Sequence, residues 1–340
     1  MASARPSGQP LFRPLSPGRT ALINWPQDFG TRFVVFVDTE EEFDWNQPLA
    51  PKNNSVDTIA SLPEAHARFA GLGVPLTMMV DFPVATNPRA IDLIRPLLTG
   101  HSCIGSQLHP WANPPIFETL TPGSSFAGNL PRGIEAAKLD ALTDAIETAF
   151  GRRPTAYRAG RYGLGKASFE LLSERGYRLD SSMRPHFSYA SEGGPDFSAL
   201  DNHAFRVGSL VELPLTTVFT GRARAFGRKL YQLGAYVPKG RAVLARTRLL
   251  QRIPLTPEGI PVAEAIEAIR IAIGEGLRIL NFAFHSPSLT PGYTPYVRDS
   301  ADLRAFWNWW DSVLVELDRL GTRSCGLAEL IRVAGGPGRT

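Results

Sequence analysis

The chain alternates between short apolar runs and longer amphipathic segments. Residues 33–37 form an unbroken run of β-branched and aromatic residues, and similar runs occur at 74–80 and 277–286. Such runs predict strands buried on both faces, as in a parallel sheet. Apolar residues recur at helical spacing between them, most clearly over 134–150 and 300–320, which predicts amphipathic helices. The alternation predicts an α/β fold whose parallel sheet closes as a deformed or incomplete barrel.

Turn and capping signals place further elements. The Asn-Asn-Ser sequence at 53–55 predicts the start of a helix that runs to about Leu72, and Asn-Pro at 87–88 predicts the start of another. Thr-Pro-Glu at 256–258 predicts a third helix start. We expect a last short strand at 323–327.

Composition divides the chain into one large domain and two flexible ends. The content of 43% hydrophobic and 20% charged residues is typical of a globular protein with an ample core. Residues 1–28, rich in Pro, Gly, Ser and Arg, lack the apolar core of a secretory signal and are predicted to be a disordered lead-in. The barrel is expected over residues 29–334 and a flexible tail over 335–340. The sequence contains no run of eighteen or more apolar residues, so no transmembrane helix is expected.

Cysteine usage indicates the compartment. The only two cysteines, Cys103 and Cys325, lie in short apolar runs and lack metal-ligand spacing. They predict free thiols and exclude a disulfide scaffold, which favours a reducing compartment. We therefore expect a cytoplasmic protein.

Polar residues follow several apolar runs directly. Asp38 and Glu40 end the first run, in an acidic stretch that continues to Asp44. Charge runs are usually solvated, so this stretch alone fits either a surface loop or a ligand-binding rim. Three more polar residues stand at the same position after later runs: His109, Arg158 and His285. Because the carboxyl ends of parallel strands meet at one rim, we expect these side chains to gather there. Such a set suits hydrolysis of an amide or ester.

Four motifs in this order resemble those of a known family. They are DTE at 38–40, GSQLHPWANPP at 105–115, YRAGRYG at 157–163 and FHSPSLTPGYTPY at 284–296, with ELPLTTVFTG at 212–221 as a further match. The chain resembles the polysaccharide deacetylase superfamily, the NodB-like group also called carbohydrate esterase family 4, and most of all a divergent WalW-like branch. The resemblance implies a deformed (β/α) barrel and a divalent metal, with removal of an acetyl group from an N-acetylated sugar.

The resemblance also implies roles for individual residues. Asp38 matches the family's catalytic base, Arg158 the arginine that orients the base, and His285 the histidine that protonates the leaving amine. Glu40 and His109 match metal ligands. Three residues of the same motifs are expected to contact the substrate: Trp111, Arg161 and Tyr162.

The second motif departs from the family pattern. Family members usually have two histidines four residues apart, and Gln107 stands where the first is expected. The divalent metal, expected to be zinc, would be held by Glu40 and His109. The residues that could complete the ligand set are Asp38, Gln107 and His285. Because amide oxygen is a weak ligand for zinc, the departure predicts a weakened site.

Three function classes remain open. The first is a metal-assisted hydrolase that deacetylates an N-acetylated glycan, such as lipopolysaccharide or capsule, or its precursor. The second is an amidohydrolase of the same fold that acts on another amide, with or without metal. The third is a non-catalytic glycan-binding module. The presence of Asp38, Arg158 and His285 together favours an enzyme, since a binding module has no need for that combination.

Residues 213–257 form a basic segment with nine Arg and Lys residues and no Asp or Glu. Its pattern predicts an insertion of two short basic amphipathic helices, broken at 238–240. The segment is either a solvated lid or a surface for an anionic membrane or glycan, for instance at the inner membrane face. Nucleic-acid binding is not expected, because zinc-finger spacing is absent and the acidic stretch at 38–44 would repel phosphate.

Overall fold

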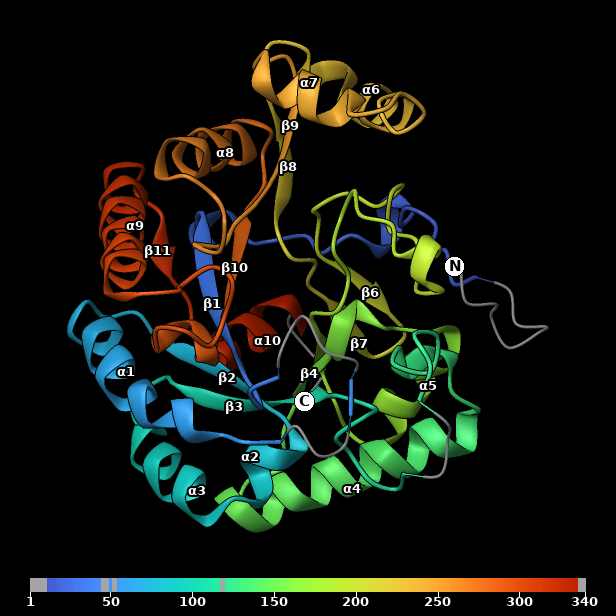
Figure 1. Ribbon diagram of the computed structural model, residues 1–340, viewed down its shortest axis with the longest axis vertical. Helices are drawn as coiled ribbons and strands as arrows, with labels where there is room; N and C mark the ends of the chain where they lie inside the picture. Colours follow the sequence, from blue (N-terminus) through green and yellow to red (C-terminus); the bar gives the residue numbers. More distant parts are fainter. Residues whose placement is uncertain (1–10, 44–48, 51–53, 117–119, 336–340) are drawn as a thin grey trace.

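Strand β1 (Arg32–Thr39) is the longest strand of a curled sheet that forms an incomplete barrel (Figure 1). The computed structural model describes residues 11–43, 49–50, 54–116 and 120–335. The strands lie in the spatial order β10 (Ile279–His285), β1, β2 (Leu76–Val80), β3 (Cys103–Leu108), β4 (Ala156–Ala159), β5 (Leu179–Asp180), β7 (Leu210–Glu212) and β6 (Phe205–Val207), and β11 (Arg323–Ser324) also pairs with β1. Only β6 pairs antiparallel to its neighbour in this sheet of the described chain. The predicted α/β barrel is therefore confirmed.

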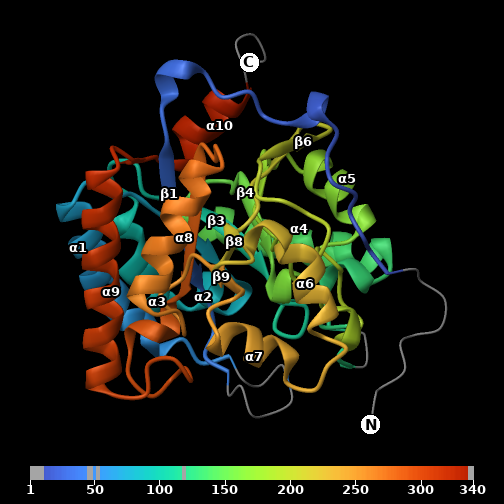
Figure 2. The same ribbon diagram turned by 90° about the horizontal axis from the view of Figure 1, so that it is seen from above.

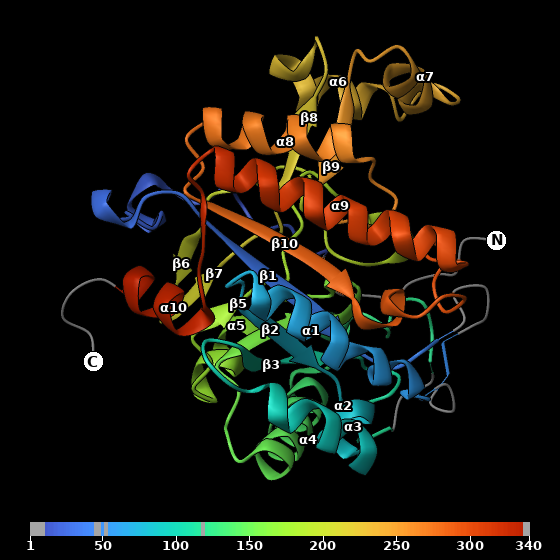
Figure 3. The same ribbon diagram turned by 90° about the vertical axis from the view of Figure 1, so that its left-hand side faces the viewer.

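Helices cover the outer face of the sheet and one of its ends. Figure 3 shows α9, α8 and α1 outside the strands, and α10 beside the end where the strands begin. The helices are α1 (Leu62–Gly71), α2 (Phe82–Thr86), α3 (Pro88–Ile94), α4 (Arg132–Phe150), α5 (Lys166–Glu174), α6 (Gly227–Leu233), α7 (Gly240–Arg246), α8 (Val262–Gly274), α9 (Ser300–Arg319) and α10 (Leu327–Gly335). None of the helices in the described ranges is long and apolar enough to cross a bilayer.

The alternation of side chains along each strand directs residues to two different cores. In β1, Phe33 and Val35 pack in the cluster under the outer helices, whereas Val34 and Phe36 belong to a second buried cluster within the barrel. Asp38 continues the inner row, because side chains two residues apart share a face. The inner row therefore changes from apolar to charged at the carboxyl ends of the strands, as the sequence predicted.

A buried amide closes part of the gap that the strands leave in the barrel. Asn281 on β10 donates from Nδ2 to the hydroxyl oxygen of Ser181 (2.9 Å) and to the carbonyl oxygens of Leu213 and Pro214 (both 3.2 Å). Asn281 is only 1% exposed, so these hydrogen bonds form away from water, where leaving them unmade is costly. They connect β10 to the loop after β7 without a ladder of backbone hydrogen bonds.

Several element boundaries differ from the predictions. The helix expected from residue 53 begins as a 3-10 turn at Asp57–Ser61 and becomes α1 only at Leu62, while residues 51–53 lie outside the described residues. The helix expected at 87–88 is confirmed, since Asn87 Oδ1 accepts from the backbone N–H of Ala90 (3.0 Å). The helix start predicted at 256–258 is wrong, because α8 begins at Val262.

The predicted lead-in at 1–28 is ordered over its described part. Residues 11–28 contain two 3-10 turns, Arg19–Ala21 and Gln27–Phe29. The N–H of Ile23 donates to the carbonyl of Ala204 (2.9 Å) beside β6. Apolar residues at these positions pack against the barrel, and this burial outweighs a composition typical of disorder.

The basic segment has its ends in the barrel and its helices away from it. Strands β8 (Thr217–Thr220) and β9 (Gln251–Pro254) form an antiparallel pair whose Val218 and Ile253 belong to the outer core. Helices α6 and α7 lie beyond this pair, at the edge of the molecule in Figure 1, and Figure 2 places α7 at the end opposite to α10. Both helices thus lie outside the barrel, and α7 lies toward the end where the strands finish.

Candidate active site

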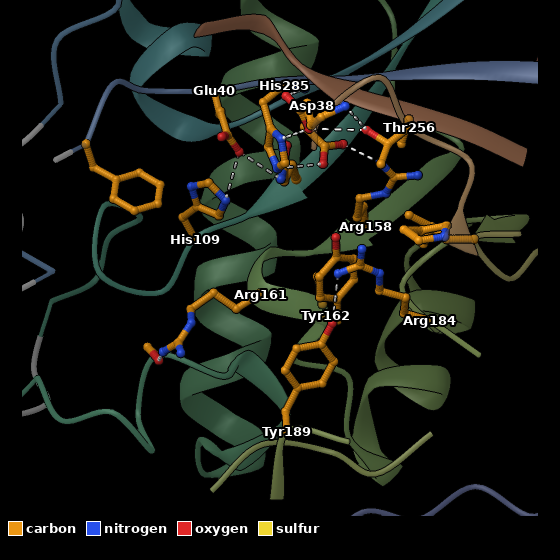
Figure 4. Close-up of a pocket in the computed structure, with 18 of the residues that line it drawn as sticks. Asp38, Glu40, His109, Arg158, Arg161, Tyr162, Arg184, Tyr189, Thr256 and His285 are labelled. Carbon is orange, nitrogen blue, oxygen red and sulfur yellow. Dashed lines mark hydrogen bonds and ion pairs between the residues drawn. The ribbon is translucent and has the colours of Figure 1, made fainter. Parts of the chain in front are cut away.

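The carboxyl ends of the strands surround a pocket of about 740 Å³ (Figure 4). All the residues that the sequence predicted for the rim line it: Asp38, Glu40, His109, Arg158 and His285. The three predicted substrate contacts also line it: Trp111, Arg161 and Tyr162. The acidic stretch at 38–44 is therefore not a solvated loop over its described part, because Asp38, Glu40 and Glu41 are buried, whereas Asp44 lies outside the described residues.

Asp38 and Arg158 form a buried ion pair at the base of the pocket. Arg158 Nη1 bonds Oδ1 of Asp38, and the two side chains are 1% and 5% exposed respectively. Arg158 also donates from Nε to the carbonyl of Ser181 (3.0 Å) and from Nη2 to its hydroxyl oxygen (3.2 Å). Its guanidinium lies over the ring of Phe36, 5.0 Å from the centroid. An arginine held by these contacts can fix the position of the carboxylate.

His285 lies between Asp38 and a second carboxylate. Its Nε2 is 3.6 Å from Oδ2 of Asp38, and its Nδ1 is 2.7 Å from Oε2 of Glu258. Burial alone would lower the pKa of His285, but the carboxylates of Glu258, Glu40 and Asp38 reverse this effect and raise the pKa well above its ordinary value. The imidazole therefore holds its proton more tightly than an isolated histidine does. We call Glu258, His285, Asp38 and Arg158 the ionic chain.

Glu258 is the site residue that the sequence interpretation missed. It accepts the backbone N–H of His285 (3.1 Å) and the hydroxyl of Ser288 (2.5 Å), in addition to the imidazole contact. Burial tends to raise its pKa, but His285 and these hydrogen bonds lower it below the ordinary value. Glu258 follows strand β9 just as Asp38 ends β1. The signal that identified Asp38 is absent here, because residues 250–255 include Gln251 and Arg252 and do not form an apolar run.

Glu40, His109 and Gln107 form the other side of the pocket. Glu40 Oε2 accepts from Nε2 of Gln107 (3.1 Å) and lies 3.5 Å from Nε2 of His109. Burial is the main reason why the pKa of Glu40 is raised to about 8, with the charges of Asp38 and Glu41 adding to this effect and the two nearby histidines opposing it. Burial thus favours the neutral form of Glu40, whereas the two histidines, and any cation bound in the pocket, favour the carboxylate.

A buried network behind the pocket orients His109. Oε2 of Glu41 lies 2.7 Å from Nδ1 of His109. Oε1 of Glu41 accepts a hydrogen bond from the indole N–H of Trp111 (2.7 Å). The indole also stacks on the imidazole, with 4.4 Å between ring centroids. The backbone N–H of Glu41 donates to Asp81 (2.7 Å). A carboxylate on one ring nitrogen of a histidine is a common support for a metal ligand, and it leaves Nε2 for the pocket.

The residues present fit a divalent cation of modest affinity. One set of possible ligand atoms, from Glu41, Asp81 and His109, lies within 4.8 Å of one another. However, Glu41 and Asp81 are fully buried and do not line the pocket, so we favour the set that faces it, Glu40 and Nε2 of His109. Oε1 of Gln107 is buried beside them without a hydrogen-bond partner. A bound cation would give the unpaired oxygen of Gln107 a partner and would favour the ionised form of Glu40.

The predicted substrate contacts differ in how much surface they offer. Trp111 is 1% exposed, so its main contacts are with His109 and Glu41 rather than with the pocket. Arg161 and Tyr162 follow β4 in a left-handed conformation, with φ of 51° and 59°. Such a conformation is unfavourable for residues with side chains and is common at functional sites. Both residues line the pocket (Figure 4).

Comparisons with known proteins support the fold. No family model and no curated protein matches the sequence. Among solved structures, a Mycobacterium smegmatis protein assigned to the polysaccharide deacetylases is 19% identical, with a TM-score of 0.52 and 94% of each chain covered. A GH57 branching enzyme from Thermococcus kodakaraensis is 11% identical, with a TM-score of 0.50, 91% of this chain and 72% of that chain covered.

The first of these structures extends over nearly all of both chains, so the whole described barrel has a counterpart in it. At this level of identity the likeness concerns the fold alone. The chain therefore has the curled α/β half-barrel of the NodB-like polysaccharide deacetylases.

Proposed function

We propose that the protein hydrolyses the acetamide group of an N-acetylated sugar in a surface glycan or in its precursor. The observation that carries the proposal is the ionic chain, which places a carboxylate and a protonated imidazole 3.6 Å apart on one wall of the pocket. Amide hydrolysis needs a base for water and an acid for the amine, and these are the two groups that the chain supplies. The shared fold with a protein assigned to the polysaccharide deacetylases supports a sugar as the substrate.

The reaction follows from the protonation states of the ionic chain. Asp38, kept ionised by Arg158, accepts a proton from water as the oxygen attacks the acetyl carbon. The carbon–nitrogen bond then breaks, and His285 gives the proton from Nε2 to the departing amine. Glu258 holds the other ring nitrogen, so that the imidazole is protonated before the bond breaks. The products are acetate and the free amino sugar, and the proton that Asp38 took from water passes to Nε2 of His285, which restores both groups for the next cycle.

Glu40 and His109 would hold a divalent cation next to this wall, with Gln107 as a further oxygen donor. When bound, the ion supplies positive charge that polarises the acetyl carbonyl. Glu41 and Trp111 keep His109 in the orientation that presents Nε2. Zinc is the cation that the sequence resemblance implies, and we propose it here as the first to test.

We also propose that the basic segment holds the protein on an anionic membrane at the inner face. Six of the twelve exposed large hydrophobic residues of the described chain lie in it: Phe226, Leu233, Tyr236, Val237, Val243 and Leu249. They alternate with nine arginines and lysines without any acid. Apolar side chains among cations suit insertion at the headgroup level of anionic lipid. The position of α6 and α7 at the edge of the molecule leaves them accessible (Figure 1).

The first prediction concerns the base. Asp38→Asn should reduce acetate release from an N-acetylated glycan by at least about 100-fold, because removal of a positioned general base costs 10²–10⁴ in rate. Asp318→Asn, the same change at an exposed site on α9, should keep the full rate. The assay measures acetate from N-acetylglucosamine oligomers and peptidoglycan, with thermal melting as a check that both variants fold. Turnover of Asp38→Asn equal to that of wild type would show that the assignment is wrong.

The second prediction concerns the cation. Gln107→His should tighten zinc binding about tenfold or more, a change of about 1.4 kcal/mol, because imidazole replaces an amide at the ligand position. Gln232→His, at an exposed position on α6, is the matched control. Calorimetry measures binding without any dependence on activity. If the two variants bind zinc equally, Glu40 and His109 do not form the site, and acetate release without metal would favour the metal-independent amidohydrolase.

The third prediction concerns the basic segment. At low salt the protein should sediment with vesicles that contain anionic lipid and remain in solution with neutral vesicles, and high salt should weaken the binding by screening. The double change Tyr236→Ser and Val243→Ser should reduce it several-fold. Val315→Ser removes an equally exposed apolar residue from α9 and should have no effect. Equal binding to both vesicle types, or retention only on an acidic glycan, would contradict a membrane contact.

A further inference from the structure

The pocket has a second cationic wall, formed by Arg184. This residue follows β5 and lines the pocket with Tyr162 and Tyr189. Its guanidinium lies 3.9 Å from the centroid of the Phe187 ring and 5.0 Å from that of Tyr162. Its Nη1 is 3.4 Å from the hydroxyl oxygen of Tyr189, and its Nε is buried without a hydrogen-bond partner. The aromatic rings hold the guanidinium, but its hydrogen-bonding capacity is largely unused.

Arg184 also differs from the other arginines of the pocket in having no acid beside it. Arg158 pairs with Asp38, and Arg161 pairs with Glu192. Within the described ranges, no carboxylate oxygen comes within ion-pair distance of Arg184. A partly buried cation without a counter-ion is unfavourable unless a ligand supplies the negative charge.

A second guanidinium lies behind Arg184 and increases the positive potential. Arg252 on β9 lies 3.2 Å from the centroid of the same Phe187 ring, and its Nε is also buried without a partner. Arg252 donates from Nη1 to the carbonyl of His186 (2.7 Å). Burial lowers the pKa of Arg252 to about 10, and the charge of Arg184 adds to this effect. Two cations that share one ring repel each other, and an anion in the pocket would relieve the repulsion.

The arrangement of this wall relative to the reacting groups suggests its role. Figure 4 shows Arg184 across Tyr162 from Glu40 and His109. The rings of Tyr162 and Tyr189 are stacked between the two sides, with centroids 5.3 Å apart, and aromatic faces of this kind can support a sugar ring. A group bound at Arg184 would therefore belong to the part of the substrate away from the acetamide.

We propose that Arg184 binds an oxyanion of the substrate, a carboxylate or a phosphate, so that the pocket selects acidic rather than neutral sugars. The planar fork of arginine matches the paired oxygens of either group. This inference rests on the proposed function for the view that the bound molecule is a sugar. The argument for an oxyanion rests on Arg184, Arg252 and their surroundings and does not depend on the proposed reaction.

The test uses probes that carry no acetamide and cannot be deacetylated. Binding of glucuronic acid, glucose 1-phosphate and glucose to the full chain is measured by calorimetry at fixed salt. We expect at least one anionic probe to bind about tenfold or more tightly than glucose, because a hydrogen bond to a charged group is worth about that much. Preference for glucuronic acid would indicate an acidic sugar, and preference for glucose 1-phosphate a sugar phosphate or a phosphate-linked carrier.

Variants distinguish Arg184 from the general basic charge. Arg184→Gln should reduce binding of the anionic probes to the level of glucose. Arg184→Lys, which keeps the charge and is the milder change for folding, should give an intermediate loss. Arg89→Gln removes the same charge from an exposed position on α3, outside the pocket and the basic segment, and should bind as wild type does. The proposal is overturned if wild type binds all three probes equally, or if Arg184→Gln and Arg89→Gln lose binding to the same extent. Absence of acetate release would count against the deacetylase function and leave these binding results unchanged.

Discussion

The arrangement of the pocket depends on one buried carboxylate held between two cations. Asp38 is bonded by Arg158 on one side and approached by His285 on the other, and Glu258 balances the charge of His285. Burial of each of these charges alone would be strongly unfavourable, so each requires its neighbour. This interdependence places a carboxylate paired with arginine next to an imidazole whose pKa is raised, and amide hydrolysis needs a base and an acid placed together in this way.

The sequence predicts the main part of this site because strand ends determine it. Asp38, Arg158 and His285 each lie on an inner row at the point where an apolar strand finishes, and the register of β1 with β10 places Asp38 directly opposite His285. Spacing along one chain is enough to identify such positions. The contact between Glu258 and His285 could not be predicted in this way, because Glu258 follows an antiparallel strand within a segment whose composition indicated only basic helices.

Other features depend on packing between distant segments and leave no local pattern. Asn281 joins β10 to the loop after β7, and an asparagine within an apolar run gives no indication of this partner. The stacking of Trp111 on His109 is of the same kind. Residues 11–28 differ from the prediction for another reason. Their composition is typical of disorder, but several of their apolar residues pack on the barrel. Burial, rather than composition, decided the structure there.

On one wall of the pocket, the charges of the ionic chain compensate one another. On the opposite wall, the charge of Arg184 has no carboxylate beside it within the described part of the chain. The most direct test of the account is the titration of the His285 imidazole by NMR, assigned by its loss in His285→Gln. The account predicts a pKa well above 6.5, lowered in Glu258→Gln and unchanged in Asp318→Asn. With the folded pKa raised, the stabilisation from this proton is present below the ordinary imidazole value and lost as pH rises through the raised value. An ordinary pKa that Glu258→Gln does not alter would contradict the ionic chain.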